Sequence, residues 1–320
     1  MATDGPRSRN AGILDRHSAL RSNGIGLPGA SAMQLAVVLL SAFALTARAE
    51  DRTPVAAVTD AGAQRPLWEI GIAGAIGGVA DYPGSDRYSL RAVPFPYFVY
   101  RGNFFRSDEK GARLRAPVSS SVELDFSGGA SFPARSGDSG PRKGMADLDY
   151  LFELGPNLRI TLGHPAPGMR LLSEWPVRAA FSTNGRRVDY RGLVFAPDVG
   201  VQTQSLLGSP WFAYADVGPV FASTRFQGYF FEVAPQYAVP GRPAYVAHGG
   251  YLGTRLELGA SRNLGKTLRV FFYGRIDDYD GGANVDSPLF KSKAGYTAFT
   301  GFAWSFLGSR NFVTAPADGS

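Results

Sequence analysis

Apolar and polar residues alternate along most of this chain, and the alternation is clearest between Leu148 and Leu162. In this run every even-numbered position is apolar, whereas most of the odd positions are polar or charged, Glu153 and Arg159 among them. A two-residue period predicts a β-strand whose faces meet different surroundings. The run exceeds the roughly five or six residues of an ordinary strand. It suits a tilted strand across a bilayer, which needs about nine to eleven residues.

Similar segments, separated by turn signals, predict about twelve strands and a single antiparallel transmembrane β-barrel over residues 68–307. We place the strands near 68–76, 90–100, 104–115, 121–127, 147–162, 169–181, 187–203, 210–221, 223–233, 250–262, 267–278 and 295–307. Glu109-Lys110-Gly111 could instead fold the third of these into a small hairpin. We expect residues 50–67 to form a flexible segment and residues 308–320 a C-terminal tail.

The N-terminal segment predicts export. The apolar run Leu35–Leu45 precedes Ala47-Arg48-Ala49, the small-x-small pattern of a signal-peptidase site, so residues 1–49 are expected to be a cleaved signal peptide. The leader is long, and translation starting at Met33 is the alternative to Met1. After Ala49 no window has the apolar length of a spanning helix, so membrane insertion would require a closed barrel.

The two faces of the predicted strands suggest different roles. Charged residues expected to face the lumen are Glu123, Asp125, Glu153, Arg159, Arg170, Glu174 and Arg178, followed by Arg255, Glu257, Arg269, Arg275 and Asp277. Because both signs occur in similar number, we expect them to pair across strands and fill a narrow interior. The four tryptophans, Trp68, Trp175, Trp211 and Trp304, share parity with apolar neighbours and are candidates for an aromatic girdle at the membrane interface. In the alternative, a soluble β-sandwich, the apolar faces would form the core.

Candidate chemistry is sparse. The chain has no Cys, which excludes disulfides and thiolate sites, and its formal charge of +6 falls once the arginine-bearing leader is removed, so nothing resembles a nucleic-acid-binding face. His164 and His248 could in principle serve a hydrolase with Ser173 or Ser205, but no spacing places them together. The acidic loop over 277–286 lacks the EF-hand pattern of a calcium site. We therefore expect no enzyme activity, cofactor or metal.

Several short stretches resemble, in their order, the outer-membrane family named for the MltA-interacting protein (MipA) and OmpV. They are DYPGSD at 81–86, PFPYFVYRG at 94–102, VELD at 122–125, RKGMADL at 142–148, LGPNL at 154–158, GRPAY at 241–245 and DSPL at 286–289. The resemblance implies an outer-membrane β-barrel of a Gram-negative cell. For one member it implies a scaffold that joins a murein-cleaving lytic transglycosylase to a murein-synthesising penicillin-binding protein. For other members it implies porin-like or adhesion roles.

The sequence therefore predicts a non-enzymatic outer-membrane scaffold, with membrane lipid and periplasmic murein enzymes as partners. A passive channel for small solutes is the alternative. A count of twelve strands places both chain ends and the basic loop Arg135–Lys143 in the periplasm, where turns are normally short. Either the third strand is miscounted, or this loop faces a partner.

Overall fold

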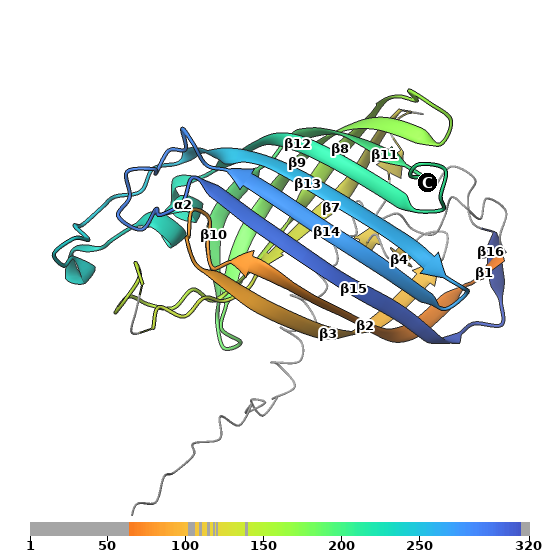
Figure 1. The fold of residues 1–320 in the computed structure, drawn as a ribbon, viewed down its shortest axis with the longest axis horizontal. Coiled ribbons are helices and arrows are strands. Elements are labelled where there is room, and N and C mark those ends of the chain that lie inside the picture. Colours follow the sequence, from red (N-terminus) through yellow and green to blue (C-terminus); the bar gives the residue numbers. More distant parts are fainter. Residues whose placement is uncertain are drawn as a thin grey trace, which may run out of the picture.

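The computed structural model describes residues 64–101, 106–108, 111–113, 116–117, 119, 121–137 and 140–314, and the predicted signal peptide lies outside them. An antiparallel sheet of 14 strands forms most of the molecule (Figure 1). Its strands are β2 (Trp68–Ala80), β3 (Tyr88–Arg101), β4 (Arg106–Asp108), β5 (Gly111–Arg113), β6 (Ala116–Pro117), β7 (Val122–Ser131), β8 (Tyr150–Gly163), β9 (Met169–Thr183), β10 (Val188–Phe195), β11 (Asp198–Thr203), β12 (Phe212–Ala222), β13 (Gly250–Leu264), β14 (Leu268–Asp278) and β15 (Ala294–Gly308).

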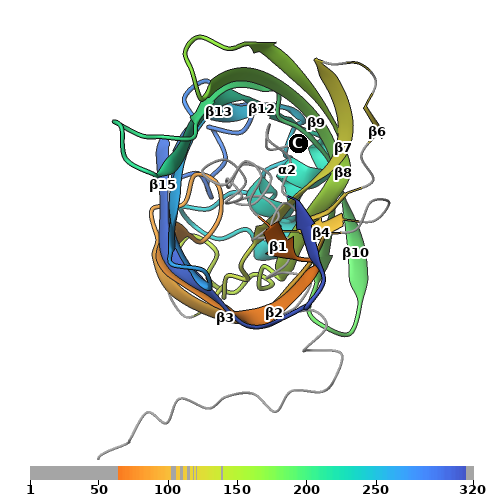
Figure 2. The same cartoon turned by 90° about the vertical axis from the view of Figure 1, so that its right-hand side faces the viewer.

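The strands follow one another around a barrel, and the last long strand, β15, pairs with the first, β2. Strands β10 and β11 both pair with β9 and β12, so they act as one strand interrupted at Ala196 and Pro197. The sheet path ends at β5 and β6, and the described residues contain no ladder that closes this seam. Seen from one end, the strands nevertheless form a ring (Figure 2).

The burial pattern identifies the medium on each side of the sheet. Along β8 the side chains of Leu154 and Leu162 are 57% and 51% exposed, whereas Glu153 and Arg159 are each 8% exposed. Apolar side chains thus point outward and charged ones inward, the reverse of a soluble protein, in which apolar groups leave the solvent. This arrangement excludes the β-sandwich alternative and confirms the predicted transmembrane β-barrel.

The two ends of the barrel differ. One end carries the short turns 164–168, 204–211 and 265–267 together with a small sheet of β1 (Gln64–Pro66) and β16 (Phe312–Thr314), which lie in the expected flexible segment and tail. The other end carries the longer loops 81–87, 132–149, 223–249 and 279–293 (Figure 1, left). Short turns are typical of the periplasmic side of such barrels, so we assign the end with β1 and β16 to the periplasm.

Two details of the predicted strand pattern are wrong. Residues 223–233, expected as a strand, contain the helix α2 (Thr224–Phe231), because Phe226, Phe230 and Phe231 pack inward on one helical face. In the segment 104–115, β4 and β5 pair with each other through Arg106 and Arg113, which makes the hairpin alternative correct. The helix removes one predicted strand and the hairpin adds one, so the two changes leave the strand count the same.

The extra strand of that hairpin also moves the basic loop. Arg135–Lys143 belongs to the loop between β7 and β8, at the end opposite β1 and β16, so of the two alternatives for this loop the miscounted third strand is correct. Within the described part of the chain, no helix has both the length and the apolar character of a membrane span.

The hydrophobic core lies at the long-loop end rather than along the whole barrel. It joins Phe226, Phe230 and Phe231 of α2 to Tyr82 and to strand residues such as Leu151. A short 3-10 helix, η1 (Pro235–Tyr237), continues the chain after α2. The helix and its loops therefore close the mouth of the barrel.

Candidate functional site

The lumen side of β7, β8 and β9 carries a buried ion-pair cluster around Arg159. Its Nε lies 2.9 Å from Glu174 Oε1, and its Nη1 lies 3.4 Å from Asp125 Oδ2. Asn157 donates from Nδ2 to Glu174 Oε2 across 3.0 Å. Glu123 and Glu174 both lie directly across from Arg159 in the ladders. The positive charge is thus surrounded by acids from both neighbouring strands.

A second pair lies nearer the long loops. Arg178 Nη1 is 3.5 Å from Glu153 Oε2, and both side chains are almost fully buried. Arg170, half-buried near the periplasmic end of β9, lies across from Gln202 of β11. The structure therefore brings five of the seven predicted lumen residues into buried ion pairs and places Glu123 and Arg170 beside the same lining.

A third cluster occupies the wall formed by β13 and β14. Asp277 is shared by two arginines, with Oδ1 2.6 Å from Arg255 Nε and Oδ2 2.8 Å from Arg275 Nε. Glu257 lies next to both arginines, 3.9 Å from Arg255 Nε. We call the first three residues the Arg–Asp277 bridge. Charges of both signs therefore line the described lumen walls.

The tryptophans lie toward the outside. Trp175 and Trp304 are each 46% exposed, and Trp68 and Trp211 are half-buried. Trp68 begins β2 and Trp211 directly precedes β12, so both lie at the periplasmic end, whereas Trp175 lies further along β9. The rings of Trp304 and Phe306 meet edge to face, with centroids 5.7 Å apart. The girdle of Trp68, Trp175, Trp211 and Trp304 remains a prediction.

The four long loops form what we call the cap. Arg242 Nη1 donates to the backbone oxygens of Pro141 and Lys143 at 2.9 and 2.7 Å, which joins the loop of α2 to the loop after β7. The hydroxyl of Tyr82 donates to Leu289 O at 2.7 Å, and Ser287 Oγ donates to Phe231 O at 2.7 Å. Each loop of the cap is thus tied to another by at least one hydrogen bond.

A buried amide pair holds the base of the cap. Asn284, 3% exposed, donates from Nδ2 to Gln227 Oε1 at 2.5 Å and to His248 O at 2.8 Å, while its Oδ1 accepts from the backbone N–H of His248. Gln227 in turn donates to Gly250 O across 2.9 Å. Buried amides with all these partners fix a single arrangement of the loops.

Burial also shifts the acidity of cap residues. It raises the pKa of Tyr82 to about 12, partly offset by Arg142, and it raises the pKa of Tyr229. The pKa of Arg142 is lowered by burial, because a charged group loses solvation there. All three shifts follow from the burial of these side chains in the cap.

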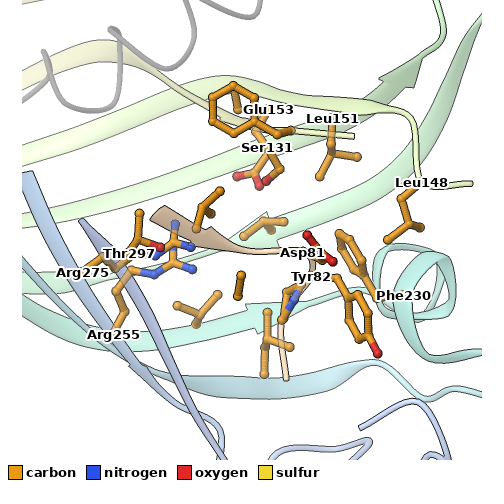
Figure 3. A pocket seen from close by; sticks show the side chains of 18 of the residues that line it. Asp81, Tyr82, Ser131, Leu148, Leu151, Glu153, Phe230, Arg255, Arg275 and Thr297 are labelled. Carbon is orange, nitrogen blue, oxygen red and sulfur yellow. The ribbon is translucent and has the colours of Figure 1, made fainter. Parts of the chain in front are cut away.

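A cavity of about 120 Å³ lies between the cap and the lumen charges. Arg255, Arg275 and Thr297 lie on one side of it, and Tyr82, Phe230 and Leu148 lie on the other (Figure 3). Aromatic side chains from α2 and from several strands complete its wall. Sequence reasoning missed both the cap and this cavity, although Phe226 and Phe230 stand one helical turn apart.

The weaker chemical candidates are not assembled into sites. His164 lies in a periplasmic turn and His248 in the cap, so the two histidines lie at opposite ends of the barrel. In the acidic loop, Asp277 belongs to the lumen and Asp280 pairs with Lys293 at 2.8 Å, which lowers the pKa of Asp280. No group of metal ligands occurs among the described residues.

The outward apolar belt, the charged lumen and the periplasmic turns define an outer-membrane β-barrel with a capped interior. The particular family follows from the sequence: the model of the MltA-interacting protein MipA family matches residues 70–306, and the chain belongs to this family. The resemblance carried by the short stretches between Asp81 and Leu289 is thereby confirmed in its family and in its fold.

Comparisons with solved structures find distant barrels. The NanC porin is 8% identical, with 74% of this chain and all of that chain covered and a TM-score of 0.34. A bacterial polysaccharide outer membrane secretin is 10% identical over 76% and 99% of the two chains, with a TM-score of 0.37. The translocator domain of the autotransporter NalP from Neisseria meningitidis is 15% identical over 75% and 89%, with a TM-score of 0.35. No curated protein matches the chain.

Proposed function

We propose that this protein is a non-enzymatic outer-membrane scaffold that binds a periplasmic murein enzyme. The family description refers to interaction with MltA, which supports a murein enzyme as partner. The structural observation that supports the proposal is the cap packed over the long-loop end, which together with the buried ion pairs on the lumen wall narrows the space that a channel would need. Function is then expected on the ends of the barrel rather than through it.

The periplasmic turn 204–211 is the part of that end best suited to contact a partner. Leu207 is 96% exposed and has a φ of 52°, a conformation that non-glycine residues rarely adopt. Hydrogen bonds from Leu206 N to Trp211 O at 2.9 Å and from Ser209 N to Leu206 O at 3.0 Å hold the turn. An ordered turn that holds a fully exposed apolar side chain in an uncommon backbone conformation is our candidate for the contact with the partner.

Pull-down from detergent-solubilised envelopes with a tagged barrel tests the proposal. We expect a murein-cleaving or murein-synthesising enzyme in the eluate, and a photo-crosslinking residue at Leu207 should link to it. The same residue at Lys143, exposed at the other end, is the matched control and should not link. Failure to recover a murein enzyme with the tagged barrel would contradict the scaffold proposal. Crosslinking to such an enzyme from position 143 alone would contradict it as well.

Conductance measurements distinguish the scaffold from the alternative function, a passive channel for small solutes. Purified protein in planar bilayers is expected to show no steady unit currents, because buried side chains occupy the lumen. Large, steady currents from the unmodified protein would favour the channel and would remove the main structural support for the scaffold.

A further inference from the structure

The cavity beneath the cap has two chemically different sides. Its apolar side includes Phe230 and Leu148, and further rings come from Phe95, Phe271 and Phe299 on the barrel wall. Its polar side includes Thr297 and the two arginines of the Arg–Asp277 bridge, Arg255 and Arg275 (Figure 3). A ligand that fits both sides needs an apolar body and one polar end.

The polar side presents unused donors. Each guanidinium has five N–H donors; Arg255 donates from Nε to Asp277 Oδ1, whereas Arg275 Nε lies 2.8 Å from Asp277 Oδ2 as an ion pair. No hydrogen bond among the described residues uses the Nη atoms of either arginine, although both residues line the cavity. Two neighbouring guanidinium ends without a hydrogen-bonded acceptor in the part of the chain that the structure describes match a carboxylate, which can accept several charge-assisted hydrogen bonds.

Two of the three acidic residues of the lining are already engaged, and the third, Asp149, directly follows Leu148 on the side opposite the arginines, which argues against a cation beside the arginines. Glu153 is paired with Arg178 at 3.5 Å, and Asp81 accepts a hydrogen bond from Ser89 Oγ at 2.6 Å. A cation in the cavity would have to displace these contacts. An anion at the arginines displaces nothing that the structure defines.

The volume restricts the ligand to a small molecule. A cavity of about 120 Å³ is slightly smaller than the engineered apolar cavity of about 150 Å³ that holds benzene. One six-membered ring with a small substituent is therefore near the upper limit. The surrounding aromatic side chains favour a flat ring, which they can contact by stacking or by their edges.

We propose that the cavity binds a small carboxylate with a single ring, with its carboxylate against Arg255 and Arg275 and its ring among the phenylalanines below the cap. Binding involves no covalent step. This site is independent of the scaffold proposal, because it lies inside the barrel and the partner contact lies at the periplasmic end.

Calorimetric titration of the purified, detergent-solubilised full barrel with benzoate tests the proposal, with neutral benzamide as the matched ligand. We expect saturable binding of one benzoate per chain and at least tenfold weaker binding of benzamide. Absence of saturable benzoate binding would overturn the proposal. Equal affinity for the two ligands would overturn the assignment of the carboxylate to the arginines.

Two variants locate the site. Ala75→Phe fills the cavity from β2 and should abolish benzoate binding, whereas Ala92→Phe adds the same ring on the exposed outer face of β3 and should leave it unchanged. Arg255→Lys keeps a positive charge near Asp277 but loses the paired Nη donors, so benzoate should bind at least fivefold more weakly. If the circular dichroism spectrum shows that Ala75→Phe does not fold, the affinity of Arg255→Lys for benzoate tests the location of the site instead. Wild-type affinity in either folded variant would overturn the site.

Discussion

Arg142, in the loop after β7, donates a hydrogen bond from Nη1 to the backbone oxygen of Phe230 in α2 across 2.9 Å. Its guanidinium also lies over the ring of Tyr82, 5.9 Å from the ring centroid. One buried side chain therefore contacts three of the four loops that form the cap, counting α2 with its loop. The stability of the cap should depend on it more than on any exposed residue nearby.

Replacing Arg142 with Met should loosen the cap. The change removes a charged hydrogen bond, worth about 1.5–3 kcal/mol, and leaves the oxygen of Phe230 without this donor. Amide hydrogens of α2 should therefore exchange roughly ten- to a hundredfold faster, as measured by mass spectrometry. Lys143→Met, at an exposed neighbour, is the control and should not change the exchange. Unchanged protection in Arg142→Met would show that the contact does not hold α2.

Breaking the Arg159 cluster should destabilise the barrel as a whole. Arg159→Met leaves Asp125 and Glu174, which are 1% and 4% exposed, without this positive partner. The free energy of unfolding should fall by about 3–5 kcal/mol, measured by urea unfolding from lipid vesicles. Adding Glu174→Gln should restore part of the loss, because one of the two buried negative charges is then removed.

The control for that cycle is Arg186→Met at the exposed turn after β9, which should change the free energy of unfolding by less than about 0.5 kcal/mol. If the effects of Arg159→Met and Glu174→Gln on the free energy of unfolding simply added in the double variant, the two residues would not be coupled as their distance indicates.

The cap should loosen at high pH through Tyr82. Because burial raises the pKa of Tyr82 from 10.0 to about 12, its neutral form is favoured in the folded cap. This contribution to stability is complete below pH 10 and is lost as the pH rises through about 12. The difference in absorbance near 295 nm between the wild-type protein and Tyr82→Phe should show one tyrosine ionising near pH 12. A Tyr82 that titrates near pH 10 would contradict its burial.

Cysteine labelling should confirm the orientation of the barrel. The chain has no natural Cys, so a single introduced thiol reports its own position. Lys143→Cys should react with a membrane-impermeant maleimide in intact cells, whereas Lys266→Cys, exposed in a turn at the opposite end, should react only after the cells are broken. The reverse pattern would invert the assignment of the two ends.

Alternation alone was sufficient to predict which side chains of a strand share a face. Glu153 and Arg159 face inward because a period of two leaves no other choice once Leu154 and Leu162 face outward. The ion-pair partners could not be predicted in the same way, because Arg159 contacts Glu174 only through the register of β8 with β9. Register depends on the whole hairpin and cannot be determined from one strand.

The cap could not be predicted from local patterns. Thr224–Phe231 is rich in aromatic residues, which favour strands when packing is ignored. It forms a helix because the mouth of the barrel buries Phe226 and Phe230 together on one side. The contacts of Arg142, Asn284 and Arg242 join loops distant in sequence, so neither spacing nor composition indicates them.

The pairing of β2 with β15 determines when this molecule can finish folding. The hydrogen bond from Ser305 Oγ to Glu69 Oε2 spans 236 positions in the sequence. The first long strand, β2, can therefore pair with β15 only after nearly all the other strands have been exported. Contacts this distant in sequence form slowly, and until then an open strand edge can pair with other chains. The newly exported polypeptide is therefore most vulnerable to aggregation before its C-terminal segment arrives, and it should depend on a chaperone during that interval.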